Sequence, residues 1–179
     1  MAKPFLRWAG GKAKLADRIL GLLGPIDEHR DVYAEPFVGG GAVFFALKAK
    51  YPKLRCVLND ANEELMNAYR VVRDDVEALI DHFVENEHVY VDVESQYYAL
   101  RTWTPETRIE DAARTRIEDA ARMIYLNKIG FNGLYRVNKS GKFNVPYGRS
   151  SSGKPRTFLD AENLRACSVA LQGVTLTNV

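Results

Sequence analysis

The alternation of apolar and polar positions predicts four elements in the first sixty residues. Apolar residues with helical spacing flank a short β-type run, and a second β-type run ends at an acidic residue. A glycine-rich turn at residues 36–41 separates the first strand from the second helix. The expected helix, strand, helix and strand span residues 14–23, 32–35, 42–50 and 54–58. This order is typical of a doubly wound nucleotide-binding sheet.

The pattern changes after residue 60. Helical spacing without a predicted strand continues to about residue 127. Residues 130–147 then alternate aromatic residues with Asn and Gly, which predicts a hairpin or an ordered loop that turns at residues 139–142. The last expected elements are a helix and a strand, over residues 160–171 and from residue 174.

We interpret the chain as an α/β protein with a helical lobe inserted after the second strand. Residues 1–60 and 150–179 would form the α/β part, and residues 61–149 the lobe with its hairpin. The lobe contains a duplication, because the eight residues 107–114, TRIEDAAR, recur identically at 115–122. Apolar positions keep helical spacing through both copies, so the duplication either lengthens a helix by about 12 Å or leaves one copy looped out.

Composition narrows the class of protein. Hydrophobic residues make up 46% of the chain and charged residues 27%, which provides enough apolar surface for a core. No apolar run approaches the ~20 residues of a membrane span, and the first residues lack the apolar stretch of a signal peptide. Cys56 and Cys167 are expected to be buried thiols, and the histidines have no metal-ligand spacing. We therefore expect a cytoplasmic protein with neither a membrane segment nor a metal site.

Positive charge is concentrated in residues 123–158, a window with seven Lys or Arg and no Asp or Glu. Such a block suggests contact with a polyanion, although a solvated basic loop has the same composition. Arginine can pair with the edge of guanine and asparagine with that of adenine, and an apolar side chain can wedge into a base step. Duplex DNA with a specific sequence would suit these residues, and a core hairpin with incidental basic ends is the alternative.

The turn from Glu35 to Gly41 provides glycines directly after a strand, where a ligand can approach the backbone closely. Asp60 ends the next strand, at the place of an acid that bonds the hydroxyls of a ribose. Phe44 occupies the third glycine position of a G-x-G-x-x-G motif, and Gly10-Gly11-Lys12-Ala13 lacks the Ser or Thr of a phosphate-binding P-loop. These departures favour a nucleoside ligand without a pyrophosphate, with a generic glycine turn as the alternative.

Trp8 and Lys12 flank a Gly-Gly turn ahead of the first strand. If this segment folds back over the carboxyl end of that strand, Trp8 stacks on or walls in a ligand, and Lys12 meets the ligand's carboxylate. Taken alone, Trp8 fits a core position better.

Four sequence blocks, FLRWAGGK, EPFVGGGAVF, LNDAN and NKIGFNGLYRVNKSGKFNVPYG, occur in the order found in Dam-type DNA adenine methyltransferases. The chain resembles this family over essentially its whole length. The resemblance implies an S-adenosylmethionine-dependent enzyme with a Rossmann-like α/β domain and a helical target-recognition domain that carries a β-hairpin. Such enzymes methylate the exocyclic amine of adenine in a short site of double-stranded DNA, commonly GATC, in restriction–modification and other settings.

The resemblance also implies roles for individual residues. Those similar to the family's cofactor site are Trp8, Lys12, Phe37, Gly39, Gly41 and Asp60. Those similar to its DNA-contacting positions are Arg7, Phe131, Asn132, Leu134, Arg136 and Arg149. Within the second set, the hairpin residues would wedge into and read the target, and Arg149 would contact a phosphate.

The family's catalytic motif, Asp/Asn-Pro-Pro-Tyr/Phe, does not occur in the sequence. Asn144-Val145-Pro146-Tyr147 comes nearest, but Val145 breaks the Pro-Pro pair and the segment belongs to the hairpin, so we assign no catalytic residue. Without the motif, nothing accepts the hydrogens of the poorly nucleophilic adenine amine or stacks on the flipped base. We expect an N-terminal portion of such a methyltransferase, or a truncated product, with an incomplete sheet and no activity alone.

Two other functions stay open. A non-catalytic, sequence-specific DNA-binding module would keep the recognition hairpin without the chemistry. A small-molecule methyltransferase would use a similar sheet, but the acid-free basic window argues against it. A steep loss of affinity with rising salt separates DNA binding from small-molecule binding.

Overall fold

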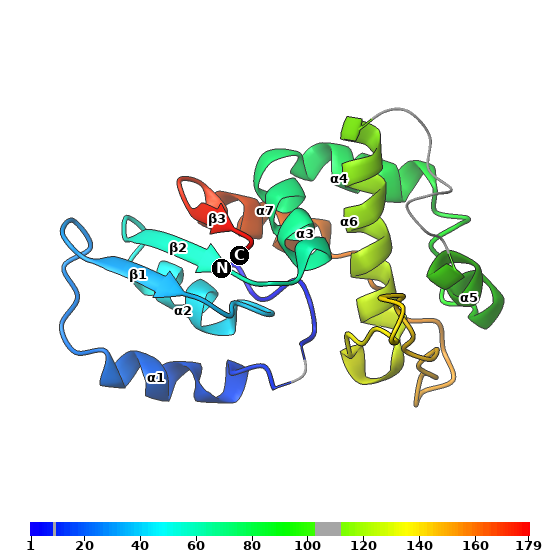
Figure 1. Ribbon diagram of the computed structural model, residues 1–179, viewed down its shortest axis with the longest axis horizontal. Helices are drawn as coiled ribbons and strands as arrows, with labels where there is room; N and C mark the ends of the chain where they lie inside the picture. The colour runs from blue at the N-terminus through cyan, green and yellow to red at the C-terminus, as the bar shows by residue number, and fades with distance from the viewer. Residues whose placement is uncertain (9, 103–111) are drawn as a thin grey trace.

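The computed structural model describes residues 1–8, 10–102 and 112–179. A small parallel sheet with its flanking helices occupies one side of the molecule, and a group of further helices occupies the other (Figure 1). The C-terminus lies at the carboxyl end of β2, because the Val179 amide donates to Asn59, whereas the N-terminal segment is bonded to Asn163 of the helix at residues 161–171. The protein is thus a mixed α/β structure, as the sequence pattern predicts.

The sheet contains three strands, β1 (Val32–Glu35), β2 (Arg55–Asn59) and β3 (Thr175–Thr177). Their order is β1-β2-β3 and both pairings are parallel. Parallel strands bring their carboxyl ends to the same edge, so the segments that follow β1 and β2 lie side by side. This topology places the glycine turn after β1 next to Asp60 after β2.

Four helical elements flank the sheet: η1 (Ala13–Leu15), α1 (Ala16–Leu22), α2 (Ala42–Lys50) and α7 (Ala161–Leu171). The helix α2 buries Val43, Phe44, Phe45 and Leu47 beside the sheet, because its sequence is apolar on most sides. Its bounds, and those of β1, match the prediction residue for residue, whereas the expected helix at residues 14–23 begins as a 3-10 turn.

The region after β2 is helical, as predicted, and contains α3 (Glu63–Asp74), α4 (Val76–Glu85), α5 (Glu94–Thr102) and α6 (Ala112–Ile129). The helix α3 packs against α6, α4 and α7, and therefore joins the sheet side to the helical side. Its apolar face is fully buried, and Asn62 caps its start by accepting a hydrogen bond from the Leu65 amide.

One contiguous apolar core runs through both sides of the molecule. The division into parts at residues 60 and 149 therefore stays a prediction. The second TRIEDAAR copy lies inside α6, while residues 107–111 of the first copy lie outside the described residues.

The segment from Gly130 to Tyr147 folds back on itself through two isolated antiparallel bridges, Gly130–Tyr147 and Val137–Phe143. It does not form the regular two-stranded hairpin that the resemblance implies. The amides of Ser140 and Lys142 both donate to the Asn138 side chain, and the Asn138 amide donates to the Lys142 carbonyl at 2.9 Å, so side-chain and backbone bonds together close the turn. The short helix η3 (Phe131–Gly133) opens the segment, and Asn132 within it has a φ of 54°.

Candidate functional site

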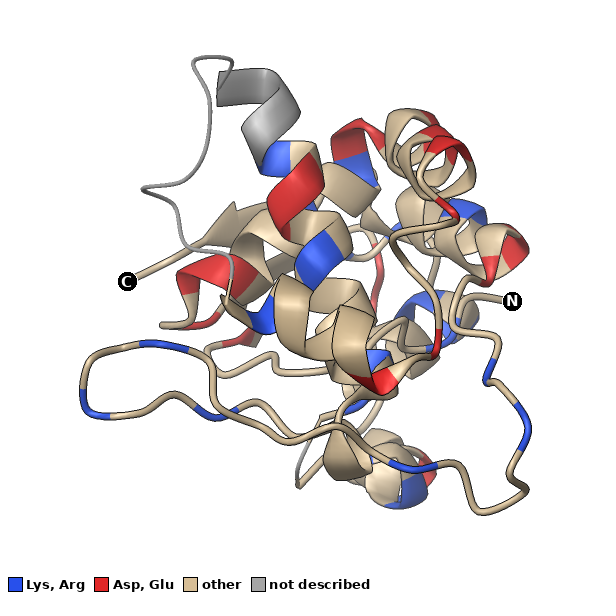
Figure 2. Ribbon diagram, turned by 90° about the vertical axis from the view of Figure 1, so that its right-hand side faces the viewer, with Lys and Arg blue, Asp and Glu red and all other residues tan. Residues whose placement is uncertain are grey.

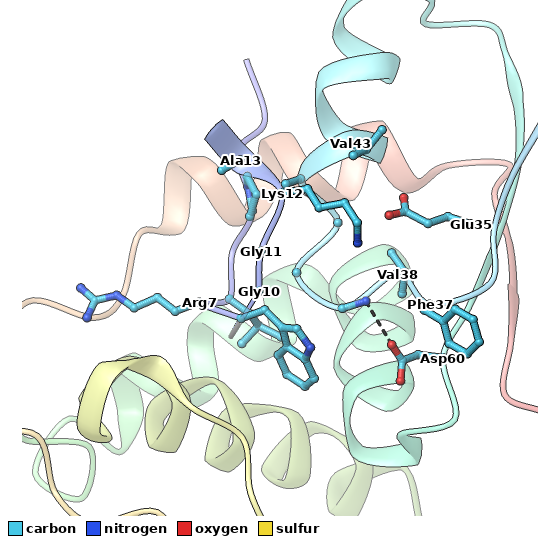
Figure 3. Close-up of a pocket in the computed structure, with 17 residues that line it drawn as sticks. Arg7, Gly10, Gly11, Lys12, Ala13, Glu35, Phe37, Val38, Val43 and Asp60 are labelled. Carbon is cyan, nitrogen blue, oxygen red and sulfur yellow. Dashed lines mark hydrogen bonds between the residues drawn. The ribbon is translucent and has the colours of Figure 1, made fainter. Parts of the chain in front are cut away.

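A pocket of about 400 Å³ lies at the carboxyl ends of β1 and β2 (Figure 3). It is bordered by the segment before η1, by the glycine turn after β1 and by Asp60 after β2. All six residues predicted for a cofactor line it, namely Trp8, Lys12, Phe37, Gly39, Gly41 and Asp60. The structure therefore brings together residues from three separate sequence blocks.

Backbone geometry explains the glycines of the turn. Gly39 and Gly41 have φ values of 49° and 70°, in the left-handed region that side chains disfavour. The Gly39 amide donates to Asp60 Oδ2 at 3.1 Å, and the Gly39 carbonyl accepts from the buried Tyr69 hydroxyl at 3.0 Å. The other Asp60 oxygen accepts from the Asn62 amide, and each oxygen keeps a lone pair for a ligand. Asp60 thus fixes the turn as well as facing the pocket.

Trp8 forms one wall of the pocket and touches the glycine turn. A Cβ atom at Gly39 would lie 2.7 Å from Trp8 Cδ1, so the indole occupies the space that a side chain would fill. On its other side, the indole stacks on Tyr135, with ring centroids 5.6 Å apart and an interplanar angle of 20°. The Tyr135 hydroxyl donates to Glu64, and burial, followed by the charge of Glu64, raises the pKa of Tyr135 to about 12. Trp8 is therefore held by the turn and by the Gly130–Tyr147 segment, which is called the recognition segment below after the role that the resemblance implies.

Glu35 is a pocket residue that the sequence analysis did not assign. It ends β1, lines the pocket and accepts a hydrogen bond from the Tyr33 hydroxyl at 3.0 Å. Burial raises the pKa of its carboxyl, and the Tyr33 hydrogen bond and the Lys12 charge only partly oppose this. Figure 3 shows the Lys12 ammonium pointing toward the Glu35 carboxylate. In the sequence, the position of Glu35 directly before the glycine turn could have identified it as a pocket residue.

The residues predicted to contact DNA lie around a second hollow of about 560 Å³. Four of the six line it: Arg7, Phe131, Asn132 and Arg149. Leu134 and Arg136 lie just beyond, in the same fold-back segment. Leu134 is half-buried against the core, whereas Arg136 is exposed and donates from Nε to Asn144 Oδ1 at 2.8 Å.

Arg7 lines both hollows, and its side chain points away from Lys12 and Asp60 (Figure 3). Its backbone is held by the buried amide of Asn127, which accepts from the Arg7 amide at 2.8 Å and donates to the Arg7 carbonyl at 2.6 Å. The same amide donates to the Gly133 carbonyl at 3.1 Å. Asn127 therefore fastens the pocket wall to the recognition segment. In the sequence, Asn127 and Lys128 interrupt the otherwise apolar residues 123–129 that end α6, which does not show which of the two is buried.

Positive charge follows the long loops at the lower edge of Figure 2, which carry Lys and Arg and no Asp or Glu. Four of these side chains are exposed and make no ion pair or hydrogen bond within the described residues: Lys139, Lys142, Arg149 and Lys154. Cations that are not neutralised by their own protein are suited to contact phosphates.

Within residues 1–8, 10–102 and 112–179, no helix is long and apolar enough to cross a membrane. The same ranges contain no group of three or more side chains that could hold a metal ion.

Known proteins provide an independent comparison. A family model described as D12 class N6 adenine-specific DNA methyltransferase matches residues 8–178. The type II methyltransferase M.MjaIII of Methanocaldococcus jannaschii is 40% identical over 97% of this chain and 61% of its own length. The type II methyltransferase M1.LlaDCHI of Lactococcus lactis subsp. cremoris is also 40% identical, over 93% of this chain and 54% of its own length.

The DNA adenine methylase of Haemophilus influenzae is 35% identical over 82% of this chain and 47% of its own length. The chain thus spans roughly half the length of the curated relatives that it matches. The family match includes all six residues predicted for a cofactor and the recognition segment. The chain therefore belongs to the D12 class of N6 adenine-specific DNA methyltransferases.

Proposed function

We propose that the pocket beside the glycine turn binds S-adenosylmethionine, and that the adjoining basic surface binds double-stranded DNA. The observation that carries the proposal is the convergence of Trp8, Lys12, Glu35 and Asp60 on one pocket whose wall also contacts the recognition segment. A family membership alone would not require these residues to meet.

The polar groups of the pocket fit the parts of S-adenosylmethionine. Asp60 has free lone pairs for ribose hydroxyls, and the absence of a side chain at Gly39 lets the Trp8 indole approach the turn and wall the pocket. We assign the Lys12 ammonium to the carboxylate of the amino-acid part and the Glu35 carboxylate to its ammonium. When bound, the cofactor supplies an electrophilic methyl group. The residues of this chain orient it and wall it from water.

The basic surface fits a duplex. Arg149 and its neighbouring loop cations would contact phosphates, while Arg136 would read a base edge. Phe131 is 48% exposed at the rim of the second hollow, where it could enter a base step. We propose that the target is the exocyclic amine of adenine in a short site, with GATC the favoured sequence by resemblance. The type II relatives support a restriction–modification setting.

We assign no catalytic residue in these 179 residues. In Asn144-Val145-Pro146-Tyr147, the amide oxygen of Asn144 accepts from Arg136, and the Tyr147 hydroxyl donates to Asp92 at 2.8 Å. Both side chains therefore serve the fold of the recognition segment. We propose that these residues bind cofactor and DNA but do not transfer the methyl group by themselves. A sequence-specific DNA-binding module is the second candidate, because the recognition surface is intact without the catalytic motif.

Methyl transfer from labelled S-adenosylmethionine to a GATC duplex, with a scrambled duplex as control, tests the proposal. We expect no transfer by the 179-residue chain, together with saturable binding of the cofactor and of the GATC duplex. Transfer to GATC alone would establish the site and overturn the assignment of no catalytic residue. Loss of both binding activities in a folded sample would overturn the proposed function itself.

A further inference from the structure

The basic loop from Tyr147 to Arg156 is fastened at both ends to one side chain of the helical region. At the first end, the Tyr147 hydroxyl donates to Asp92 Oδ1 at 2.8 Å. At the second end, the Arg156 amide and Nε donate to Asp92 Oδ2 at 2.6 and 2.9 Å, and Nη2 donates to Oδ1 at 2.6 Å. A single carboxylate therefore closes the loop, which carries Arg149 and Lys154 between its ends.

Asp92 is well placed to act as a fixed point. Its side chain is only 2% exposed, and it lies in the connection between α4 and α5. The preceding residue is tied to α6, because the Tyr125 hydroxyl donates to the Val91 carbonyl at 2.6 Å. Burial alone would raise the pKa of Asp92, but the hydrogen bonds from Arg156 and Tyr147 outweigh it, so the pKa lies below its ordinary value. The carboxylate is therefore ionised in the folded protein.

The start of the loop is also fixed by the end of α6. The Gly148 amide donates to the Ile129 carbonyl at 3.0 Å, and a Cβ at Gly148 would lie 2.8 Å from the Gly130 carbonyl oxygen. Between these anchors, the Arg149 side chain is exposed, has no partner among the described residues and lines the second hollow with Arg7. The anchors thus set the position of a free cation without neutralising it.

We propose that Asp92 is a positioning residue for DNA binding, which holds the Tyr147–Arg156 loop so that Arg149 meets a phosphate of the duplex. This inference rests on the proposed function. The physical reason is that a ten-residue loop with free ends would lose conformational entropy on binding, whereas a loop closed at Asp92 has lost it already. Arg156 holds the end of the loop and is not assigned a phosphate contact, because its charge is neutralised by Asp92.

The sign of a substitution at Asp92 separates positioning from simple electrostatics. Asp92→Asn removes a negative charge close to the DNA-binding surface, which by charge alone strengthens binding to a polyanion. Positioning predicts the opposite, since the amide cannot accept the full set of bonds from Arg156. We expect Asp92→Asn to weaken binding of a duplex by roughly tenfold, the cost of a lost contact to a charged group.

The test is the affinity for a fluorescent GATC duplex, titrated at a series of salt concentrations. The slope of log affinity against log salt should fall by about 0.9 in Asp92→Asn, because one phosphate contact is lost. In the wild-type chain, Arg149→Gln should lower the slope by the same amount as Asp92→Asn does. In the Asp92→Asn background, Arg149→Gln should have no further effect on the slope. Arg156→Lys keeps the positive charge but not the two-pronged contact with Asp92, so it should also weaken duplex binding. This variant tests the proposal if Asp92→Asn fails to fold.

Two control variants exclude a general loss of structure. Glu77→Gln removes a carboxylate that also binds an arginine, Arg165, through two bonds of 2.7 Å, but this pair joins α4 to α7 and includes no residue of the loop. Leu79→Ala lowers stability from within the core of α4. Both should keep the wild-type salt slope, and all variants should keep the wild-type affinity for S-adenosylmethionine.

An unchanged slope, or tighter binding, in folded Asp92→Asn and Arg156→Lys would overturn the positioning role. So would an Arg149→Gln effect of full size in the Asp92→Asn background. If the wild-type chain itself binds the duplex without salt dependence, the proposed DNA-binding function fails, and that result is distinct from a failure confined to the variants.

Discussion

The indole of Trp8 stacks on the phenol ring of Tyr135 with centroids 5.6 Å apart, and these two residues belong to different parts of the proposed site. Trp8 walls the pocket proposed for the cofactor, and Tyr135 lies in the recognition segment one residue before Arg136. The Tyr135 hydroxyl is bonded to Glu64, which also lies 3.7 Å from the buried guanidinium of Arg122. The stack therefore joins the pocket to the recognition segment through side chains that are themselves fixed.

Gly39→Ala should displace Trp8 and weaken cofactor binding. The added Cβ would lie 2.7 Å from the indole, and the φ of 49° adds strain of about 1–2 kcal/mol. We expect the affinity for S-adenosylmethionine to fall by roughly tenfold, because the pocket is no longer preorganised. Isothermal titration calorimetry measures it. Gly24→Ala is the matched control, since it has a similar φ strain but nothing within 4 Å, and it should leave cofactor affinity unchanged.

Gly133→Ala should separate the recognition segment from Arg7. The new Cβ would overlap the Cβ of Arg7, whose backbone is held from the other side by Asn127. We expect weaker duplex binding, measured by fluorescence anisotropy. Gly141→Ala, in the same segment with a φ of 74° and open space around it, should bind DNA like the wild type. Equal losses in the two variants would mean that backbone strain, not the Arg7 contact, sets the effect.

Arg136→Ala should relax discrimination at one base pair by ~1–3 kcal/mol, as expected for an arginine that reads a base edge. Its Nε and Nη2 groups are bonded to Asn144, which holds the guanidinium in a fixed direction. Competition between GATC duplexes with single substitutions measures the discrimination. Lys139→Ala, which removes an exposed cation from the same segment, should weaken all duplexes alike. The same uniform weakening in Arg136→Ala would make Arg136 a phosphate contact instead.

Because Asp92 is ionised in the folded protein, the free energy of unfolding should fall as the pH becomes acidic. Because its folded pKa is lowered, its contribution is complete above the unfolded pKa of about 3.9 and disappears as pH falls through the folded pKa. We expect the free energy of unfolding of Asp92→Asn to be about 2 kcal/mol smaller than that of the wild type at pH 7. Urea unfolding at a series of pH values should show this gap constant down to pH ~5 and closing below pH ~4. A gap that closes between pH 7 and 5 would contradict the assignment.

Local patterns were sufficient for the elements that depend on neighbouring residues. The bounds of β1 and α2 follow from a short apolar run and from an apolar helix that starts at a glycine, and both were predicted without error. Phe37, Gly39, Gly41 and Asp60 could be named because they follow predicted strands, whereas Trp8 and Lys12 were named from the Gly-Gly turn ahead of the first strand and from the family resemblance. The predicted range of β2, residues 54–58, is one residue too early, because an apolar run does not show which of its end residues pairs with the neighbouring strand.

The contacts that organise the recognition surface could not be predicted in this way. Asp92 and Arg156 are 64 residues apart, and Asn127 and Arg7 are 120 residues apart. Each looks like an ordinary polar residue in its own segment, because periodicity identifies a buried face but not the partner that satisfies a buried polar group. Residues 130–147 were predicted to form a hairpin or an ordered loop, because alternating aromatic residues do not show that the fold-back has only isolated bridges and side-chain bonds to Asn138.

Saturable binding of S-adenosylmethionine to the 179-residue chain tests the central claim most directly. Equilibrium dialysis with labelled cofactor should give one site per chain, no competition by ATP and a large loss of affinity in Asp60→Ala, whose duplex binding is retained. These results would establish a nucleoside pocket that does not need a pyrophosphate. Absence of saturable binding, equal competition by ATP, or a parallel loss of DNA binding in Asp60→Ala would contradict the account.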